Sequence, residues 1–164
     1  DDKMDLMKLA LLELSDALRP IDRIGLVSYS NKATLLLPST VGDKKQEINS
    51  IVESMKSGGT TSGFSGFRRA YKEVNKNLIP EGNNQVIVIT DGLFNPEDSD
   101  KIRQLVEDQA NQGIRTSIVG VKSATGIQRV LEQFTQKGNG AFVALENEGD
   151  RDALLMEIRE ASEK

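Results

Sequence analysis

Residues 86–90, Val-Ile-Val-Ile-Thr, are the segment that most constrains the fold. Every residue in this run is β-branched, and polar residues flank it on both sides, which favours a short strand. A strand that is apolar on both faces belongs in the middle of a parallel sheet. Because parallel strands need long crossover connections, helices should precede and follow this strand along the chain.

The second half of the chain has the spacing expected of alternating helices and strands. Apolar residues recur at helical intervals over residues 102–110, 127–134 and 154–158, and strands are predicted at 116–121 and 141–145. Gly113 is placed to end the first of these helices, and residues 138–140 should form a turn. This order indicates βαβ units, hence a parallel sheet with helices on its faces.

The first half predicts a helix over residues 4–18, two strands at 24–29 and 33–37, and helices at 48–55 and 67–78. Pro38 should stop the second strand, and the short polar link between the two strands predicts an antiparallel hairpin. A chain of 164 residues suits one domain. We therefore expect a single, doubly wound α/β domain over residues 1–164. Its mostly parallel sheet should carry one antiparallel edge hairpin and helices on both faces.

Composition excludes several classes of function. The net charge of −4 argues against a nucleic-acid binder, and no apolar run is long enough to cross a bilayer. The absence of Cys and His excludes thiolate zinc sites, cysteine nucleophiles and a Ser-His-Asp triad. Any bound metal must therefore be held by oxygen, which favours Mg²⁺, Ca²⁺ or Mn²⁺.

Two loops carry residues that could do chemistry. Asp91 follows the strand at 86–90, where its carboxylate could hold a cation; the alternative is that Asp91 and Gly92 only form a turn. The Gly-rich loop at 58–63 opens a helix, so its hydroxyls either face a ligand or cap that helix. It lacks the Gly-Lys-Ser/Thr ending of a phosphate-binding P-loop.

The ordered set of motifs resembles a von Willebrand factor type A domain, most closely the bacterial members that bind magnesium. The resemblance covers nearly the whole chain. It rests on Leu-Arg-Pro-Ile-Asp-Arg-Ile-Gly-Leu-Val-Ser-Tyr-Ser (18–30), Gly-Gly-Thr-Thr (58–61), Val-Ile-Val-Ile-Thr-Asp-Gly (86–92), Gly-Ile-Arg-Thr-Ser-Ile-Val-Gly-Val (113–121) and Gly-Asn-Gly-Ala-Phe (138–142).

The resemblance implies a metal-ion-dependent adhesion site. In that family three loops supply ligands, and here Thr60 matches the family's Thr and Asp91 its Asp, whereas Thr61 is the less favoured of the two threonines. The family's first loop, Asp-x-Ser-x-Ser after a central first strand, is absent from these residues. We expect that strand and loop to exist in the protein outside this sequence. Thr60 and Asp91 alone should hold a divalent ion weakly, because such ions take about six or more oxygens.

The resemblance implies binding of a partner protein without catalysis. The cation would be Mg²⁺, with Mn²⁺ or Ca²⁺ as substitutes, and its open position would be filled by an Asp or Glu of the partner. Neither nucleic acid nor membrane is expected to contact this domain. Leu93, Phe94 and Phe64 lie near the expected site and could contact the partner; alternatively Phe94 folds under its own loop and Phe64 packs in the core. Arg68 and Arg69 could bind an anion, although a helix surface is the favoured position for them.

Two other functions stay open. The first is a metal-free interaction module whose site is vestigial. The second is a phosphotransfer or hydrolase domain with Asp91 as nucleophile and Lys122 as its partner, although no second acid precedes Lys122. The resemblance also suggests a membrane-anchored bacterial protein that faces outside the cytoplasm, with its anchor elsewhere.

Overall fold

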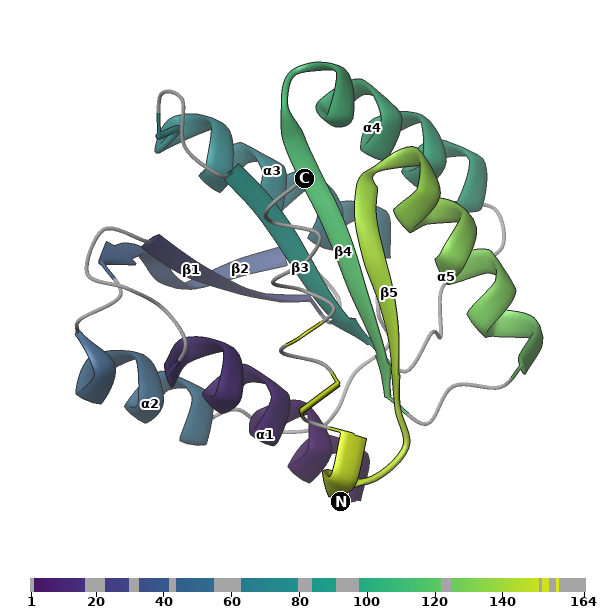
Figure 1. The fold of residues 1–164 in the computed structure, drawn as a ribbon. Helices are drawn as coiled ribbons and strands as arrows, with labels where there is room; N and C mark the ends of the chain where they lie inside the picture. Colours follow the sequence, from purple (N-terminus) through teal and green to yellow (C-terminus); the bar gives the residue numbers. More distant parts are fainter. Residues whose placement is uncertain are drawn as a thin grey trace.

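The computed structural model describes residues 2–16, 23–29, 33–41, 44–54, 63–79, 84–90, 98–121, 125–150, 152–153 and 156. Helices and strands alternate through its second half, as the sequence predicts (Figure 1). In chain order the elements are α1 (Asp2–Asp16), β1 (Arg23–Tyr29), β2 (Ala33–Val41), α2 (Lys45–Glu53), α3 (Gly63–Lys76), β3 (Asn84–Thr90), α4 (Ser99–Asn111), β4 (Ile114–Val121), α5 (Thr125–Lys137), β5 (Asn139–Leu145) and the short 3₁₀ helix η2 (Glu148–Asp150).

A three-stranded parallel sheet with the order β3-β4-β5 is the centre of the described fold. The register pairs Thr90 with Gly120 and Val121 with Leu145, so the carboxyl ends of all three strands lie at one edge. Parallel pairing of β3 confirms the prediction made from its β-branched residues. Its predicted middle position is not seen in the described part of the chain, where β4 lies between β3 and β5. On β4 every residue except Arg115 is buried.

β1 and β2 pair antiparallel as a separate two-stranded sheet. The prediction that Pro38 stops the second strand is wrong, because β2 continues to Val41. The pairing shifts register between Ile24↔Thr40 and Leu26↔Leu37, which leaves an extra residue on β2 beside Pro38. Proline has no N–H to donate, and a bulge is the place in a ladder where that donor is not needed.

The predicted single mixed sheet with an antiparallel edge hairpin is not seen in the described residues, which form two sheets. No described residue of β1 or β2 pairs with β3, and the link at 30–32 lies outside the described chain. Helix α3 packs against β1, β2 and β3, so it connects the two sheets on one side (Figure 1). Sequence periodicity alone could not reveal this division, because it identifies strands without fixing which edges pair.

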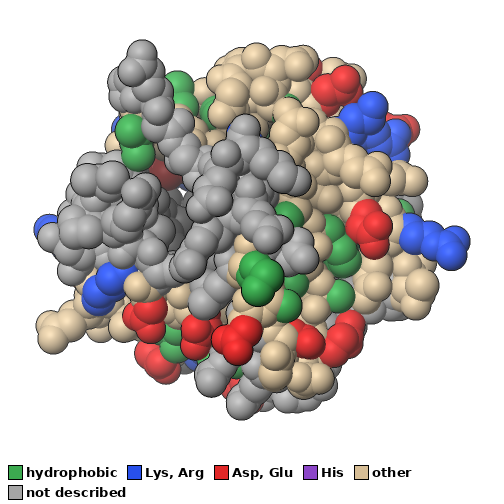
Figure 2. Space-filling model, in the orientation of Figure 1, with side chains coloured by type: hydrophobic (Ala, Val, Ile, Leu, Met, Phe, Trp, Pro, Cys, Tyr) green, Lys and Arg blue, Asp and Glu red, His purple; other side chains and the backbone are tan. Residues whose placement is uncertain are grey.

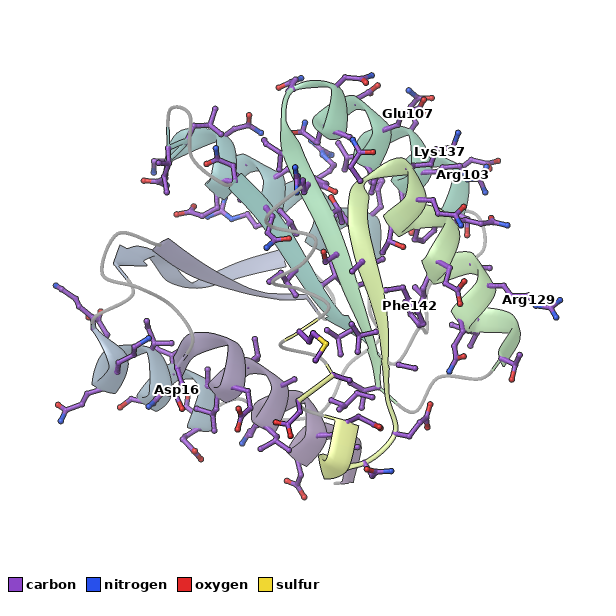
Figure 3. The ribbon with its side chains drawn as sticks, in the orientation of Figure 1. Asp16, Arg103, Glu107, Arg129, Lys137 and Phe142 are labelled. Atoms are coloured by element: carbon purple, nitrogen blue, oxygen red, sulfur yellow. The ribbon has the colours of Figure 1, made fainter. Side chains whose placement is uncertain are left out.

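One face of the parallel sheet is covered by α3, α4 and α5. Phe67 and Tyr71 from α3 meet Phe134 from α5 there, and the rings of Phe67 and Phe134 are edge to face with centroids 6.5 Å apart. Phe142 projects from β5 toward α5 and packs against the same cluster (Figure 3). The remaining buried members of this main core are Val86, Val88, Ile102, Val106, Ile114, Ile118 and Leu131.

Helix α1 covers the opposite face, so helices lie on both faces as predicted. Its Leu6 and Ala10 pack against β4 and β5 in a cluster that also contains Val119, Val121, Val143 and Leu145. Helix α2 packs against α1, and the Lys8 ammonium donates a hydrogen bond of 2.9 Å to the backbone oxygen of Glu53. Among the described helices, none is both long and apolar enough to cross a membrane.

The helix ends follow the sequence signals in part. Gly113, which follows the C-cap residue Gln112 of α4, has φ +88°, a conformation that glycine adopts without strain, and this confirms it as the predicted stop. The helix predicted over residues 67–78 is shorter at its end, because α3 ends at Lys76 and Leu78 is 46% exposed. The predicted turn at 138–140 is shorter than expected, because β5 already begins at Asn139, which has φ 56°. Leu154, Leu155 and Ile158 of the predicted last helix lie outside the described residues.

Candidate functional site

The edge at which β3, β4 and β5 end is where the candidate site is expected. In parallel α/β sheets, ligands bind beyond the carboxyl ends of the strands. Thr90 ends β3 at this edge, and the loop that contains Asp91 begins with the next residue. Helix α4 begins at Ser99 after that loop, while α3 begins at Gly63 after the Gly-rich loop. The two predicted ligand loops therefore each join an element that is described.

Most of the predicted site residues belong to the two ligand loops. Thr60, Asp91, Leu93 and Phe94 all lie outside the described residues, as does Lys122 of the phosphotransfer alternative. Their roles stay predictions. In the described part of the chain, no group of three or more acidic residues is placed to hold a metal ion.

Phe64 is the one predicted site residue that is described. It lies in the first turn of α3, is partly buried, and packs against the main core, which is the packing alternative that the sequence left open. Two cations flank its ring. The guanidinium carbon of Arg68 lies 5.8 Å from the ring centroid, and the ammonium of Lys101 lies 5.9 Å from it. Both are within the range of cation–π attraction.

The contact between Phe64 and Lys101 joins the first turn of α3 to the first turn of α4. Sequence reasoning missed it, because Lys101 is an ordinary exposed lysine in a helical pattern and nothing in that pattern says which helix lies opposite. The contact brings together the helix starts that follow the Gly-rich loop and the Asp91 loop. A helix start also carries partial positive charge from the aligned dipoles of its peptide groups.

The start of α4 is acidic, as its sequence suggests. Asp100 lies in the first turn and accepts an ion-pair hydrogen bond of 3.1 Å from Arg103, which is three residues further along the helix. Asp98 occupies the N-cap position but its side chain makes no capping hydrogen bond. Asp100 is 90% exposed, so its pair with Arg103 contributes little to stability.

The fold is that of an α/β domain with a parallel sheet between helices. The chain belongs to the von Willebrand factor type A domain family, which it matches over residues 1–158. This confirms the resemblance stated from the sequence. Among bacterial relatives it is 29% identical over 157 residues to the uncharacterized protein YfbK of Escherichia coli strain K12, covering 94% of this chain. The chain spans only 27% of the length of that relative.

Solved structures share the fold at low sequence identity. The conserved hypothetical protein BatB of Bacteroides thetaiotaomicron superposes with a TM-score of 0.76 at 19% identity, covering 98% of this chain and 89% of BatB. Proximal thread matrix protein 1 from the mussel byssus, solved with a zinc-occupied MIDAS motif, has a TM-score of 0.73 at 17% identity, covering 98% and 43% of the two chains. The manganese-loaded TRAP protein of Plasmodium vivax has a TM-score of 0.67 at 18% identity, covering 92% and 63%.

Proposed function

We propose that this domain is a protein-binding module without catalytic activity that captures a carboxylate of its partner through a divalent cation. The observation that carries the proposal is the contact between Phe64 and Lys101. It joins the first turns of α3 and α4, the two helices that follow the ligand loops along the chain. Family membership supports it, as do the two structures of this fold that contain zinc and manganese.

Thr60 and Asp91 would supply a hydroxyl and a carboxylate to the cation. Both are hard oxygen donors, and a chain without Cys or His offers no softer ligand, so the donor types fit Mg²⁺ or Mn²⁺. Such an ion is coordinated by about six oxygens, so two side chains are too few to complete its shell. Other oxygens, including water, must therefore complete its shell, and affinity through Thr60 and Asp91 alone should be weak.

The bound cation would supply a positive charge with a replaceable ligand. An incoming Asp or Glu could then take that position as a charged oxygen ligand. Leu93 and Phe94 follow Asp91 and Gly92 directly, so they would form an apolar rim beside the ion and contribute to partner selection. We infer that Phe94→Ala weakens partner binding while leaving the affinity for the cation unchanged.

Binding of a peptide with a single Asp in an otherwise neutral sequence tests this function. The same peptide with Asn is the control, and each is measured with Mn²⁺ and with EDTA. We expect the Asp peptide to bind only with Mn²⁺, and Asp91→Asn to abolish binding. Equal binding of the Asp and Asn peptides, or binding that EDTA leaves unchanged, would instead indicate the metal-free module.

The phosphotransfer alternative has its own test. Acetyl phosphate with Mg²⁺ should leave the protein unmodified by mass spectrometry if the domain only binds its partner. Phosphate covalently attached at Asp91 would favour the enzyme.

A further inference from the structure

A basic groove lies between α3 and α4. Its volume is about 520 Å³. Arg68, Arg69 and Lys72 line it from α3, and Leu105 contributes an apolar side chain from α4. None of the described residues that line the groove is an Asp or a Glu. The charged residues that line the groove, among those the structure describes, are thus all cationic, although the net charge of the chain is −4.

Contacts between the two helices fix the groove near both of its ends. At one end Lys101 of α4 lies over the ring of Phe64 of α3. At the other end the side-chain amide of Asn75 donates 2.9 Å to Oε1 of Gln109, and the same nitrogen donates 2.8 Å to the backbone oxygen of Tyr71. Because α3 and α4 are held at both ends, the groove is preformed, and a ligand that enters it need not separate the helices.

The three cationic side chains of the groove differ in burial, and burial affects how strongly each one attracts an anion. Arg68 and Lys72 are exposed, whereas Arg69 is partly buried and its Nε is inaccessible with no hydrogen-bond partner in the described structure. Buried donors nearly always have partners, so Arg69 is incompletely satisfied. A charge that is already partly removed from water attracts an opposite charge more strongly than a solvated one does. A guanidinium also receives a carboxylate with two parallel hydrogen bonds.

We propose that this groove binds an acidic segment of a partner protein. The stretch of α3 from residue 65 to residue 75 is about 15 Å long, at about 1.5 Å per helical residue. That length matches about five residues of extended chain. Carboxylates spaced along such a segment would meet Arg68, Arg69 and Lys72 in turn, while an apolar residue between them would contact Leu105.

The distribution of charge favours a protein segment over nucleic acid. Acidic side chains gather along the lower edge of the molecule, over α1, α2 and η2 (Figure 2). The net charge of −4 opposes a long polyanion, whereas a short acidic segment matches the length of the groove. The proposal does not depend on the cation site, since none of the groove residues is a predicted metal ligand.

The test is fluorescence anisotropy with a labelled eight-residue peptide, Glu-Glu-Leu-Glu-Glu-Leu-Glu-Glu, and the same peptide with Gln for Glu. All measurements contain EDTA, so that failure of the cation site leaves the result unaffected. The test variant is Arg68→Gln with Lys72→Gln. The control variant, Arg129→Gln with Lys76→Gln, removes the same two charges from exposed positions outside the groove; Arg129 lies on the outer side of α5 (Figure 3).

We expect the Glu peptide to bind the wild type, and the groove variant to bind at least about fivefold more weakly than the control variant. Binding should also weaken as salt rises, because exposed charges are screened. Equal affinity of the two variants, equal binding of the Gln peptide, or no binding by the wild type would overturn the proposal. Co-sedimentation with phosphatidylserine vesicles, lost only in the groove variant and without peptide binding, would overturn it in favour of a membrane surface.

Discussion

The side-chain hydroxyls of Tyr71 on α3 and Thr116 on β4 share a hydrogen bond inside the main core. Tyr71 is 2% exposed and Thr116 is fully buried, so each hydroxyl satisfies a polar group that water cannot reach. Neither was singled out from the sequence, because the helical and strand patterns place both inside without showing that they meet. The bond ties the helix that follows the Gly-rich loop to the central strand of the parallel sheet.

Tyr71→Phe should destabilise the fold by about 1–3 kcal/mol, because it leaves the buried hydroxyl of Thr116 without this partner. Adding Thr116→Val removes both polar groups and keeps nearly the same volumes. The double variant should therefore lose less than the sum of the two single losses. Urea unfolding of the four proteins measures the coupling energy, and strictly additive losses would contradict this role of the bond.

Alkaline pH should weaken the fold through the same residue. Burial raises the pKa of Tyr71 above its ordinary value of 10.0, against a smaller lowering by the hydrogen bond to Thr116. The folded protein thus holds the phenolic proton more tightly than the unfolded chain does. The contribution of this proton to the free energy of unfolding is fully present below pH about 10. It is lost as the pH rises toward the raised pKa of Tyr71, and the free energy falls by at most about 1.4 kcal/mol per pH unit.

The comparison with Tyr71→Phe isolates this effect, because every other ionisable side chain is present in both proteins. Unfolding free energies measured between pH 9 and pH 11 should fall more steeply for the wild type. Parallel curves for the two proteins would show that Tyr71 does not contribute.

Two glycines should respond to alanine in opposite ways. A Cβ at Gly140 would overlap the backbone carbonyl of Thr116, so Gly140→Ala should destabilise the protein by more than about 2 kcal/mol as β5 moves away from β4. At Gly126, in the first turn of α5, a Cβ meets nothing within 4 Å. Gly126→Ala should raise stability by up to about 1 kcal/mol through helix propensity. The melting temperatures of the two variants test this, and similar changes in melting temperature would contradict the close packing at Gly140.

The sequence predicted the elements better than it predicted their pairing. The β-branched residues of β3 and the helical spacing of α4 and α5 are local signals, and these elements form close to the predicted positions. Pro38 shows the limit of such signals, since a bulge lets the strand continue past a residue that ordinarily ends one. The division into two sheets depends on contacts between distant segments, which the local pattern does not encode.

In the candidate site, too, local sequence signals predict single residues but not the contacts between distant segments. The motifs predict Thr60 and Asp91, which lie outside the described residues, whereas core packing, one of the two alternatives for Phe64, is observed. The cations around Phe64, Arg68 and Lys101, come from two different helices and lie 33 positions apart in the sequence, so only the fold brings them together. For the same reason the sequence pattern favours an ordinary helix surface for Arg68 and Arg69, although the neighbouring α4 turns that surface into one wall of a groove.

Titration of Mn²⁺ into the protein, followed by electron paramagnetic resonance of the free ion, tests the central claim most directly. Asp91→Ala removes the predicted carboxylate ligand, and Thr60→Ala removes the hydroxyl. Asp98→Ala and Thr61→Ala are the matched controls from the same two segments. The account predicts saturable binding, weak and on the order of millimolar, that Asp91→Ala abolishes, Thr60→Ala weakens and the controls leave unchanged. Absence of saturable binding by the wild type, or unaltered binding by Asp91→Ala, would contradict it.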